Sequence, residues 1–430
     1  MVYNIGILGM GTVGTGTAEI LLNPTGRHPL LTKIKIKRVG VRSLEKERKI
    51  TLPPAVITTD LAAIVTDPEI DIVVELLGGL EPARSLILQA IQAGKHIVTA
   101  NKAVIARYGD EIYSAANAAK VYVLIEGAVG GGIPVIEPLK QSLGANRISS
   151  VMGIVNGTTN YILTKMSSEG TAFNQVLSEA QSLGYAEADP TADVEGLDAA
   201  DKIAILSSLA FNRRVKREEI FTEGITGIDS VDIQYAAKLG FVIKLLAIAQ
   251  GGDSPDQLQV RVHPTLVPHN HPLANINDVY NAILVEGDPI GQVMFFGPGA
   301  GSGPTASAVV ADILNIVGVL VSSGKTEVLD PLLSCSHQDY CDLMPTETIS
   351  TRFYGRFLTQ DLPGVIGELG TCFGKHNVSL ESVVQTGCQD NLAEIVIITH
   401  KVKEGDFQQA LREIQQTTAI IKTPSILRVL

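Results

Sequence analysis

A strand, a glycine-rich turn and a helix follow one another at the start of the chain, and this order constrains the fold more than any other feature. Residues 3–8 read as a short buried strand, and Gly9, Gly11 and Gly14 follow with the spacing G-x-G-x-x-G before an apolar helical pattern. A glycine triplet alone would also fit a plain tight turn. The strand before it and the helix after it instead favour a dinucleotide site, with the pyrophosphate at the helix N-terminus.

More strand-like segments recur downstream, with helical patterns between them. They cover residues 34–41, 71–76, 96–99 and 121–125. Regular alternation of strands and helices predicts a parallel, doubly wound sheet. We therefore expect an α/β fold that begins with a Rossmann-type domain.

Two basic residues follow strands of this predicted sheet. Arg42 stands where an NAD-selective protein usually carries an acid, and its guanidinium suits the 2′-phosphate of NADP. Arg42 could also be an ordinary loop residue, so NADP is favoured and NAD stays open. Lys102 lies just past the carboxyl end of the strand 96–99, the edge where such sheets bind ligands, and we expect it to face cofactor or substrate.

Two polar or glycine-rich loops come next. Residues 126–134 contain three consecutive glycines, which suit either a hinge between domains or a ring of carbonyls around a cation or cofactor. The sequence alone leaves both readings open. Residues 156–161 (Asn-Gly-Thr-Thr-Asn-Tyr) form a polar turn that opens a helix, which suits a small polar ligand or a nicotinamide.

An acidic stretch that ends in a lysine is the strongest sign of chemistry. Asp198 and Lys202 are four residues apart and share a helical stripe with the apolar residues Ile205, Leu206 and Leu209. A charged pair on a buried face is costly unless it lines a cleft that uses it. A zwitterionic amino-acid substrate would suit this inventory, with carboxylates for its ammonium and a lysine for its reacting oxygen.

Charge and cysteine content limit the class of protein. The net charge of −11 argues against nucleic acid or an anionic membrane surface as main partner. The four cysteines all lie in the last quarter of the chain without metal-type spacing, as a reducing cytosol tolerates. Strand-like residues begin at Tyr3, so we expect no secretory leader, and Lys244 or Asp312 interrupts the longest apolar stretches. We expect a cytoplasmic protein without a membrane span.

The last eighty residues follow a different pattern. The predicted order of strands and helices from Thr351 is βαββαβ, which is ferredoxin-like. The turn from Asp361 to Gly364 at a helix N-terminus, and His376 and Asn377, resemble an ACT domain, a module that typically binds an amino acid between paired copies. Pairing that serves only oligomerisation stays an alternative.

The motifs together carry a family resemblance. The glycine fingerprint, Thr-Ala-Asn-Lys102, the Gly-Gly-Gly loop, the polar turn at Gly157, and the stretches 184–190 and 196–202 resemble homoserine dehydrogenase, in order and over nearly the whole chain. The resemblance implies NAD(P)-dependent interconversion of L-homoserine and L-aspartate 4-semialdehyde. It also implies feedback by L-threonine and a homodimer or homotetramer.

The resemblance assigns roles residue by residue. It makes Lys202 the general acid/base and Lys102 a second catalytic lysine that also contacts cofactor. The substrate would be bound by Glu187, Asp198, Asp193, Tyr185 and Thr158. The cofactor would be bound by Gly9, Gly11, Thr12, Val13, Gly14, Arg42, Gly157, Gly301 and Gly303. A monovalent cation, for which we expect sodium, would be bound by Glu126, Val129, Gly131 and Ile133, mainly through backbone carbonyls. Threonine would be bound by Asp361, Gly364 and Asn377.

The domain boundaries follow from the same reading. We expect a Rossmann domain at 1–130, an α+β catalytic and dimerisation domain at 131–330, a linker at 331–350 and an ACT domain at 351–430. Residues of about 300–330 should pack back on the nucleotide domain. Asp201 departs from the family pattern, and because adjacent helical residues point about 100° apart, we expect it to face away from Lys202 and do little.

Two other functions compete with this interpretation. An acylating semialdehyde dehydrogenase needs a thiolate nucleophile in its substrate domain, and no cysteine precedes Cys335, so we reject it. A catalytically inactive sensor that binds dinucleotide and amino acid stays the alternative, although both lysines and all the acidic residues are present.

Overall fold

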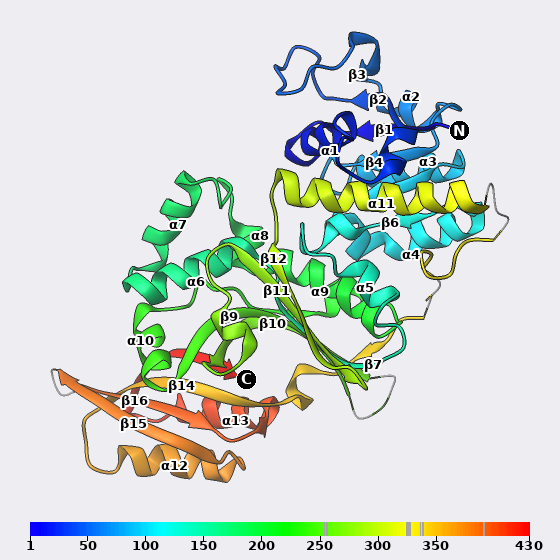
Figure 1. Cartoon of the computed structure of the whole chain (residues 1–430). Helices are drawn as coiled ribbons and strands as arrows, with labels where there is room; N and C mark the ends of the chain where they lie inside the picture. Colours follow the sequence, from blue (N-terminus) through cyan, green and yellow to red (C-terminus); the bar gives the residue numbers. More distant parts are fainter. Residues whose placement is uncertain (253, 255–256, 324–327, 336, 338, 390–391) are drawn as a thin grey trace. The chain divides into compact units, whose positions relative to one another are not determined.

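The chain folds into two compact units in a computed structural model that describes residues 1–252, 254, 257–323, 328–335, 337, 339–389 and 392–430 (Figure 1). The first unit comprises Met1–Val151, Asp201–Glu219 and Asn281–Cys341. The second unit comprises Met152–Ala200, Ile220–Tyr280 and Asp342–Leu430. Both units are therefore assembled from segments that are distant in sequence.

The first unit contains a parallel sheet of six strands. Its strands are β1 (Tyr3–Leu8), β2 (Ile34–Gly40), β3 (Ile57–Thr58), β4 (Ile72–Glu75), β5 (His96–Thr99) and β6 (Val123–Leu124). They lie in the order β3-β2-β1-β4-β5-β6, and each neighbouring pair is parallel. The order reverses between β1 and β4, which is where such sheets bind dinucleotides. The predicted doubly wound sheet is confirmed.

Helices connect these strands and pack on the sheet. They are α1 (Thr12–Leu22), α2 (Leu61–Thr66), α3 (Ala83–Gln92) and α4 (Lys102–Ala119), with two 3₁₀ turns, η1 (Pro29–Lys33) and η2 (Pro54–Val56). Asp60 and Asn101 cap the N-termini of α2 and α4 by accepting hydrogen bonds from backbone N–H groups. These caps fix where the helices begin and hence where the loops at the carboxyl edge of the sheet end.

A long apolar helix, α11 (Ser302–Ser323), completes the core around β1 and β2. It packs against α1, and Figure 1 shows it as the yellow helix that runs along the sheet. By length and composition α11 could span a membrane despite Asp312, so the expectation that no segment qualifies is wrong. Half of its apolar window is buried inside the protein, and Asp312 is fully buried, as suits a core helix.

Shorter elements complete the first unit. They are η3 (Glu126–Ala128), α5 (Ile136–Lys140), most of β7 (Arg147–Ile154), most of α9 (Leu197–Ala210), η4 (Arg217–Glu219), β11 (Tyr280–Asp288) and β12 (Gly291–Pro298). Strands β12, β11 and β7 are neighbours in this order.

The second unit combines helices with a mainly antiparallel sheet. Its elements before residue 345 are α6 (Gly157–Glu169), α7 (Phe173–Ser182), α8 (Thr191–Val194), β8 (Phe221–Thr222), α10 (Ser230–Lys238), β9 (Phe241–Gly251), β10 (Gln257–Pro268), η5 (Pro272–Asn275) and β13 (Asp342–Leu343). Strands β9 and β10 pair antiparallel over eleven residues each, while β8 and β13 add to β10 in parallel. Helix α10 packs on β9 and on α6.

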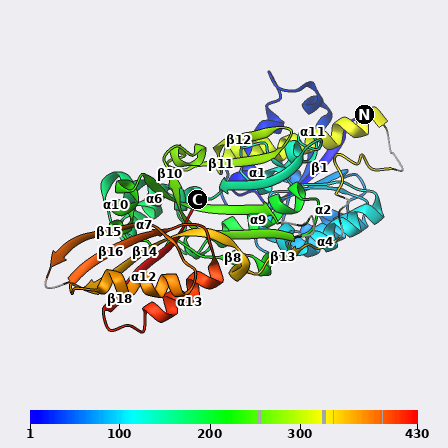
Figure 2. The same cartoon turned by 90° about the horizontal axis from the view of Figure 1, so that it is seen from below.

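The rest of the second unit has the predicted βαββαβ order. Its elements are η6 (Thr346–Thr348), β14 (Ser350–Gln360), α12 (Val365–Lys375), β15 (Leu380–Gln389), β16 (Leu392–Thr399), β17 (Val402–Lys403), α13 (Glu404–Ile414) and β18 (Ile420–Val429). The strand order is β18-β14-β16-β15, and α12 and α13 pack side by side on one face (Figure 2). Phe353 and Phe407 stack between sheet and helices with ring centroids 4.0 Å apart.

This ferredoxin-like segment is not a separate body. Its last strand, β18, pairs in parallel with β10 through Thr265 to Arg428 and Leu266 to Val429. The buried Arg428 donates hydrogen bonds to Glu404 of α13 and to Glu223, at 2.8 Å, in the segment after β8. Strand pairing thus joins the ferredoxin-like sheet to β10, and the ion pair between Arg428 and Glu223 joins it to the segment after β8.

Candidate active site

The glycine fingerprint borders a large cavity in the first unit. Gly9 has φ of 103°, and a Cβ there would lie 2.7 Å from the carbonyl oxygen of Leu76. A Cβ at Gly14 would lie 2.1 Å from the carbonyl oxygen of Gly9, so only glycine lets α1 start this close to β1. At Gly11 a Cβ would meet open space. The cavity measures about 1030 Å³, and Gly9, Gly11 and Thr12 line it while Val13 does not.

Basic side chains gather at the same cavity. The exposed Arg42 lines it, as do Lys46, Arg48 and Lys49 of the loop after β2. Arg48 closes this loop by donating hydrogen bonds to the carbonyls of Ser43 and Lys46. The cluster can attract a phosphate group, and sequence reasoning found only Arg42 of it. Gly303 also lines the cavity; Gly301, with φ of 123°, does not.

A buried carboxylate organises the turn that precedes Lys102. Glu75 ends β4 and is fully buried, and its oxygens accept hydrogen bonds from the Thr99 hydroxyl at 2.6 Å and the Leu77 N–H at 2.8 Å. The Asn101 side chain donates to the carbonyl of Gly79 at 2.8 Å and caps α4. Burial raises the pKa of Glu75 above its usual value. The half-buried Lys102 is thereby held at the first position of α4, at the carboxyl edge of the sheet.

The three glycines after η3 pack against another loop. Gly131 has φ of 53°, and a Cβ there would lie 2.5 Å from the carbonyl oxygen of Gly299. A Cβ at Gly132 would lie 2.7 Å from Pro304, and the Gly132 N–H donates to the carbonyl of Pro298 at 3.1 Å. The glycines are therefore required by a close contact between two loops of the first unit.

The loop also has free acceptors for a cation. Val129, Gly131 and Ile133 are buried, and within the described part of the chain no N–H group donates a hydrogen bond to their carbonyl oxygens. Buried carbonyls without a partner are uncommon unless water or an ion satisfies them. The donor set of hard oxygens fits a monovalent cation in chemistry.

Glu126 does something that the sequence did not predict. Its carboxylate accepts hydrogen bonds from the backbone N–H groups of Val135, Ile136 and Glu137, at 2.6–3.0 Å, and so caps α5. Its own N–H donates to Asp312 at 2.8 Å. Glu126, Glu137 and Asp312 can each place one oxygen within 4.8 Å of the others, and burial raises the pKa of all three, that of Asp312 strongly. A lone charge in an apolar helix was the signal that could have identified Asp312.

In the second unit, one asparagine joins two of the predicted substrate carboxylates. Asn156 Nδ2 donates to Asp193 Oδ1 at 2.7 Å and to Asp198 Oδ2 at 2.8 Å. Its Oδ1 accepts from the N–H of Thr159 and caps α6. Two carboxylates held side by side form a site for a cationic group such as an ammonium. Sequence reasoning placed Asn156 in a ligand-binding turn but missed this role.

The other predicted substrate residues lie around the same turn or apart from it. Thr158 donates to the carbonyl of Tyr185 at 2.6 Å, which fixes Tyr185 beside α6. A Cβ at Gly157 would lie 2.8 Å from the carbonyl oxygen of Val279, so glycine is needed there. Glu187 is exposed, and no hydrogen bond or ion pair joins its carboxylate to another described residue. The structure therefore brings Asp193 and Asp198 together and leaves Glu187 outside their contacts.

Helix α9 carries both charged residues of the acidic motif on its buried side. Asp198 and Lys202 are 7% and 8% exposed, as their place on the apolar stripe predicts. Asp201 is also buried and accepts hydrogen bonds from Arg107 and Arg217. The expectation that Asp201 does little is therefore wrong: its neighbours are two arginines of the first unit.

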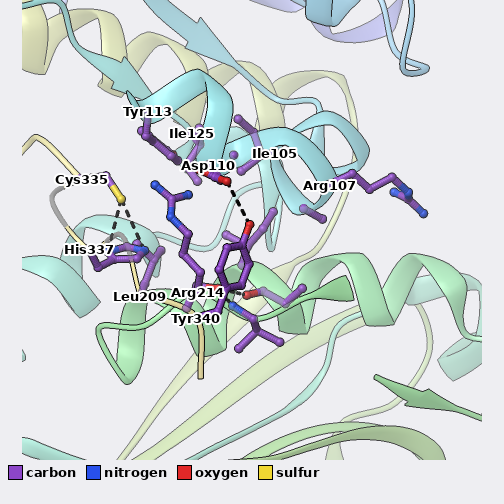
Figure 3. A pocket seen from close by; sticks show the side chains of 16 residues that line it. Ile105, Arg107, Asp110, Tyr113, Ile125, Leu209, Arg214, Cys335, His337 and Tyr340 are labelled. Carbon is purple, nitrogen blue, oxygen red and sulfur yellow. Dashed lines mark hydrogen bonds between the residues drawn. The ribbon is translucent and has the colours of Figure 1, made fainter. Parts of the chain in front are cut away.

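A second, small cavity of about 50 Å³ lies between α4, α9 and the residues Cys335, His337 and Tyr340 of the first unit (Figure 3). Arg214 points toward Tyr113 there, and Tyr340 donates a hydrogen bond to Asp110. Arg107 also lines the cavity but points away from this group in Figure 3, and none of the lining residues that the structure describes is a predicted substrate or cofactor residue.

The predicted effector residues lie at the two turns that flank α12. Gly364, with φ of 98°, precedes the helix, and Asn377, with φ of 57°, follows it. Asp361 is exposed and accepts a hydrogen bond from Gln385 at 3.3 Å. All three residues are exposed to solvent and hence accessible to an effector.

A Rossmann-type sheet with a basic cavity at its glycine turn and a lysine at its carboxyl edge is typical of dinucleotide-dependent oxidoreductases, and here a ferredoxin-like sheet accompanies it. The family model described as the NAD-binding domain of homoserine dehydrogenase matches residues 9–126, the homoserine dehydrogenase model matches 134–314, and the ACT domain model matches 356–418. The chain belongs to the homoserine dehydrogenase family.

Two relatives match over the full length of the chain, and a third matches most of it. A homoserine dehydrogenase of Synechocystis sp. is 66% identical, with 100% of both chains covered. The crystal structure of a homoserine dehydrogenase from Thiobacillus denitrificans superposes with a TM-score of 0.91 at 41% identity, covering 100% of this chain and 98% of that one. A hyperthermophilic archaeal homoserine dehydrogenase in complex with NADPH has a TM-score of 0.61 at 27% identity and covers 74% of this chain and 98% of its own.

Proposed function

We propose that this oxidoreductase interconverts L-homoserine and L-aspartate 4-semialdehyde with Lys202 as the proton donor and acceptor. In the reducing direction, one hydride and one proton convert the aldehyde to the primary alcohol. The observation that carries the proposal is the buried lysine on α9, one helical turn after an aspartate whose carboxylate is paired with Asp193 through Asn156. An amino-acid substrate needs both features, a site for its ammonium and an acid for its oxygen.

The chain's own residues divide the work. Asp193 and Asp198, held together by Asn156, bind the substrate ammonium, and Tyr185 and Thr158 shape the turn beside them. Glu187 is exposed and adds a carboxylate at the solvent-facing side of the site. Lys202 gives its proton to the aldehyde oxygen and takes it back in the oxidising direction. Lys102 orients substrate or cofactor at the carboxyl edge of the sheet. The nicotinamide, when bound, supplies or accepts the hydride.

NADP is the preferred dinucleotide in this proposal. Arg42, Lys46, Arg48 and Lys49 surround the cavity beyond β2, where an NAD-selective site would offer an acid to the ribose. The pyrophosphate lies on Gly9, Gly11, Thr12, Val13 and Gly14, while Gly157, Gly301 and Gly303 complete the cofactor site from other loops. The carbonyls of Val129, Gly131 and Ile133, with Glu126, would hold a sodium ion, whose charge would stabilise the glycine loop.

Regulation and assembly complete the proposal. L-threonine binds at Asp361, Gly364 and Asn377 and inhibits the enzyme. The chain forms a homodimer or homotetramer in the cytoplasm; strand β12 supports self-association because its Met294 and Phe296 are exposed by 41% and 55%. Functional domains at 1–130, 131–330 and 351–430, with a linker at 331–350, are supported by the ranges that the three family models match.

Initial rates with L-aspartate 4-semialdehyde test the function, with NADPH or NADH and with or without threonine. We expect turnover that forms homoserine, faster with NADPH, and lower rates with threonine. Binding of threonine and dinucleotide without oxidation of NADPH or NADH would instead favour the inactive sensor. Equal rates with and without threonine, in a protein that turns over, would remove only the regulatory part.

A further inference from the structure

A buried ion-pair cluster joins the two helices that carry the candidate catalytic lysines. Asp201 on α9 is 6% exposed. Arg217 Nε donates to Asp201 Oδ1 at 2.8 Å, and Arg107 Nη1 lies 3.1 Å from Oδ1 and 3.2 Å from Oδ2. Asp201 therefore holds one arginine from η4 and another from α4.

The cluster reaches the first turn of α4 and the second turn of α9. Arg107 Nη1 also donates to the carbonyl of Ala103 at 3.2 Å, and Ala103 directly follows Lys102. Asp201 directly precedes Lys202. The contact between Arg107 and Asp201 is thus a cross-link between α4 and α9 at the level of the two lysines, and all of its residues belong to the first unit.

We propose that Asp201 is a positioning residue: through Arg107 it fixes the separation of α4 and α9 and so the placement of Lys102 relative to Lys202. The inference rests on the proposed proton-transfer role of Lys202. Because reacting groups must be held in near-attack geometry, a shift of about 1 Å in one helix can lower turnover on the order of 100-fold.

The two arginines that contact Asp201 have different functions. Arg217 is as buried as Asp201, with both side chains 9% exposed, and its pairing neutralises a charge that would be costly to leave alone. The side chain of Arg107 is 29% exposed, so its truncation leaves water rather than an unpaired buried charge. Arg107→Met therefore removes the link to α4 and keeps the Asp201–Arg217 pair that stabilises the fold.

Another arginine provides a matched control. Arg84 on α3 makes two hydrogen bonds of 2.7 Å to Glu111 on α4, and its side chain is 32% exposed. This pair also anchors α4, but to α3 and not to α9. Arg84→Met removes an arginine of similar exposure, together with its two hydrogen bonds to Glu111 and its contact with the Tyr108 ring, without touching the proposed link.

The experiment compares Arg107→Met, Arg84→Met, Asp201→Asn, Lys202→Met and the Arg107→Met/Asp201→Asn double variant in the full-length protein. Turnover, KM for L-aspartate 4-semialdehyde, NADPH affinity, melting temperature and the kinetic isotope effect with nicotinamide-deuterated NADPH are measured. We expect Arg107→Met to lower kcat on the order of 10-fold to 100-fold and to raise the isotope effect, because chemistry becomes slower. NADPH affinity and melting temperature should match those of Arg84→Met, which keeps native kcat.

The double variant should lose little more kcat than Asp201→Asn alone, because both changes cut the same link. Equal kcat for Arg107→Met and Arg84→Met, with Lys202→Met inactive, would overturn the positioning role and leave the proposed function standing. Near-native turnover by Lys202→Met would instead refute the proton-transfer assignment itself.

Discussion

At the scale of single residues, Asn156 is the side chain whose loss should be felt most specifically by the substrate. Its amide nitrogen bridges Asp193 and Asp198, and its oxygen caps α6. Without the bridge, two carboxylates repel each other and lose their fixed geometry. Hydrogen bonds to charged groups contribute about 1.5–3 kcal/mol each, which is enough to change affinity by one or two orders of magnitude.

Asn156→Ser separates the two functions of this residue. Serine caps helix N-termini as well as asparagine does but lacks the amide donor. We expect kcat/KM for homoserine to fall on the order of 10-fold to 100-fold while the melting temperature stays near that of the wild type. Steady-state kinetics and thermal melting check this. An unchanged KM for homoserine would show that the paired carboxylates do not bind its ammonium.

The sequence indicated which types of residue belong to the site better than it indicated which residues they contact. Asp198 and Lys202 stand out because charges on a buried stripe need a use, and their burial follows from that argument. Asp193, which is half-buried, was assigned only by the family resemblance. Arg107 and Arg217 do not stand out, and the polar turn indicated Asn156 but not its contacts with two acids, because a polar side chain carries no sign of its distant partner. Glu75 and Asp312 did carry a signal, a single acid in an otherwise apolar strand or helix.

At the scale of elements, a buried lysine ties strand β9 to the helix that begins at the polar turn. Lys244 is 2% exposed and donates to Asn160 of α6 at 3.2 Å, to Asn277 at 3.1 Å and to the carbonyl of Ile276. Burial lowers the pKa of Lys244 to about 8 from its usual 10.5. Above the folded pKa the unfolded chain binds more protons than the folded one, so stability rises with pH until the unfolded pKa is reached.

This linkage predicts a pH effect that Lys244→Met abolishes. Between about pH 8 and about pH 9.5, the free energy of unfolding of the wild type should rise by about 1.5 kcal/mol relative to the variant, which has nothing to titrate at this position. Urea unfolding at the two pH values measures the difference. Parallel pH dependence of wild type and variant would mean that Lys244 titrates normally in the fold.

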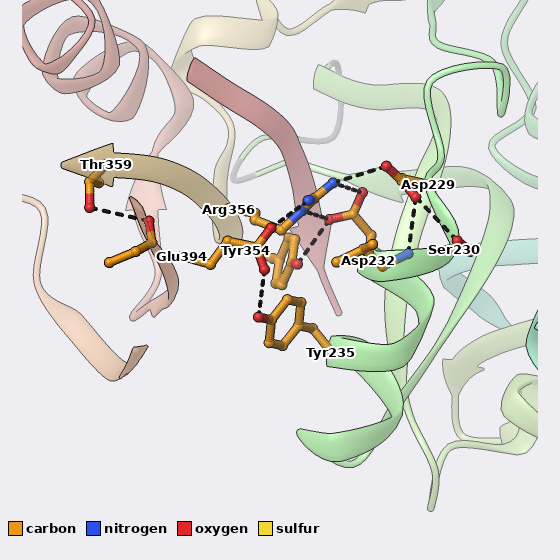
Figure 4. A network of polar contacts seen from close by, with 10 residues as sticks. Asp229, Ser230, Asp232, Tyr235, Tyr354, Arg356, Thr359 and Glu394 are labelled. Atoms are coloured by element: carbon orange, nitrogen blue, oxygen red, sulfur yellow. Dashed lines mark hydrogen bonds and ion pairs between the residues drawn. The ribbon is translucent and has the colours of Figure 1, made fainter. Parts of the chain in front are cut away.

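A second buried cluster joins helix α10 to the regulatory strands (Figure 4). Arg356 of β14 donates to the fully buried Asp232 at 2.7 Å and to Glu394 of β16 at 2.9 Å, and the Tyr354 hydroxyl donates to Asp232 at 3.0 Å. Tyr235 of α10 donates to Glu394 at 2.7 Å. Since α10 also packs on α6, the cluster connects the ferredoxin-like sheet to the helix that begins at Gly157.

Breaking this cluster on one side should be costly. Asp232→Ala removes a carboxylate that balances the positive charge of the buried Arg356. We therefore expect a loss of about 3–5 kcal/mol in the free energy of unfolding. Adding Arg356→Met should recover part of that loss, because the uncompensated charge is then gone. Urea denaturation of the single and double variants provides the measurement. A double variant less stable than both single ones would contradict the ion-pair explanation.

In the whole molecule, the ACT domain is built into the rest of the second unit. The predicted βαββαβ order is confirmed, but a sequence pattern shows the period of a strand and not its partner across the sheet. The parallel pairing of β18 with β10, and the ion pairs from Arg428 to Glu404 and Glu223, could therefore not be predicted. The parallel sheet of the first unit could be predicted, because strand, glycine turn and helix follow one another locally in the chain.

Truncation before β14 should accordingly destabilise the protein rather than merely deregulate it. A chain that ends at residue 349 exposes the edge of β10 at Thr265 and Leu266 and leaves Asp232 without Arg356. We expect lower soluble yield and a lower melting temperature than for the full chain. A soluble truncated chain with native melting temperature would show that the module is an independent attachment.

The central claim is that Lys202 moves the proton in a nicotinamide-dependent reduction, and turnover of Lys202→Met tests it most directly. The oxidation of NADPH with L-aspartate 4-semialdehyde is followed for wild type and variant, with NADPH affinity measured in parallel. We expect the variant to bind NADPH normally and to lose turnover by about 100-fold to 10,000-fold, as removal of a general acid does. Near-native turnover of the variant would contradict the claim.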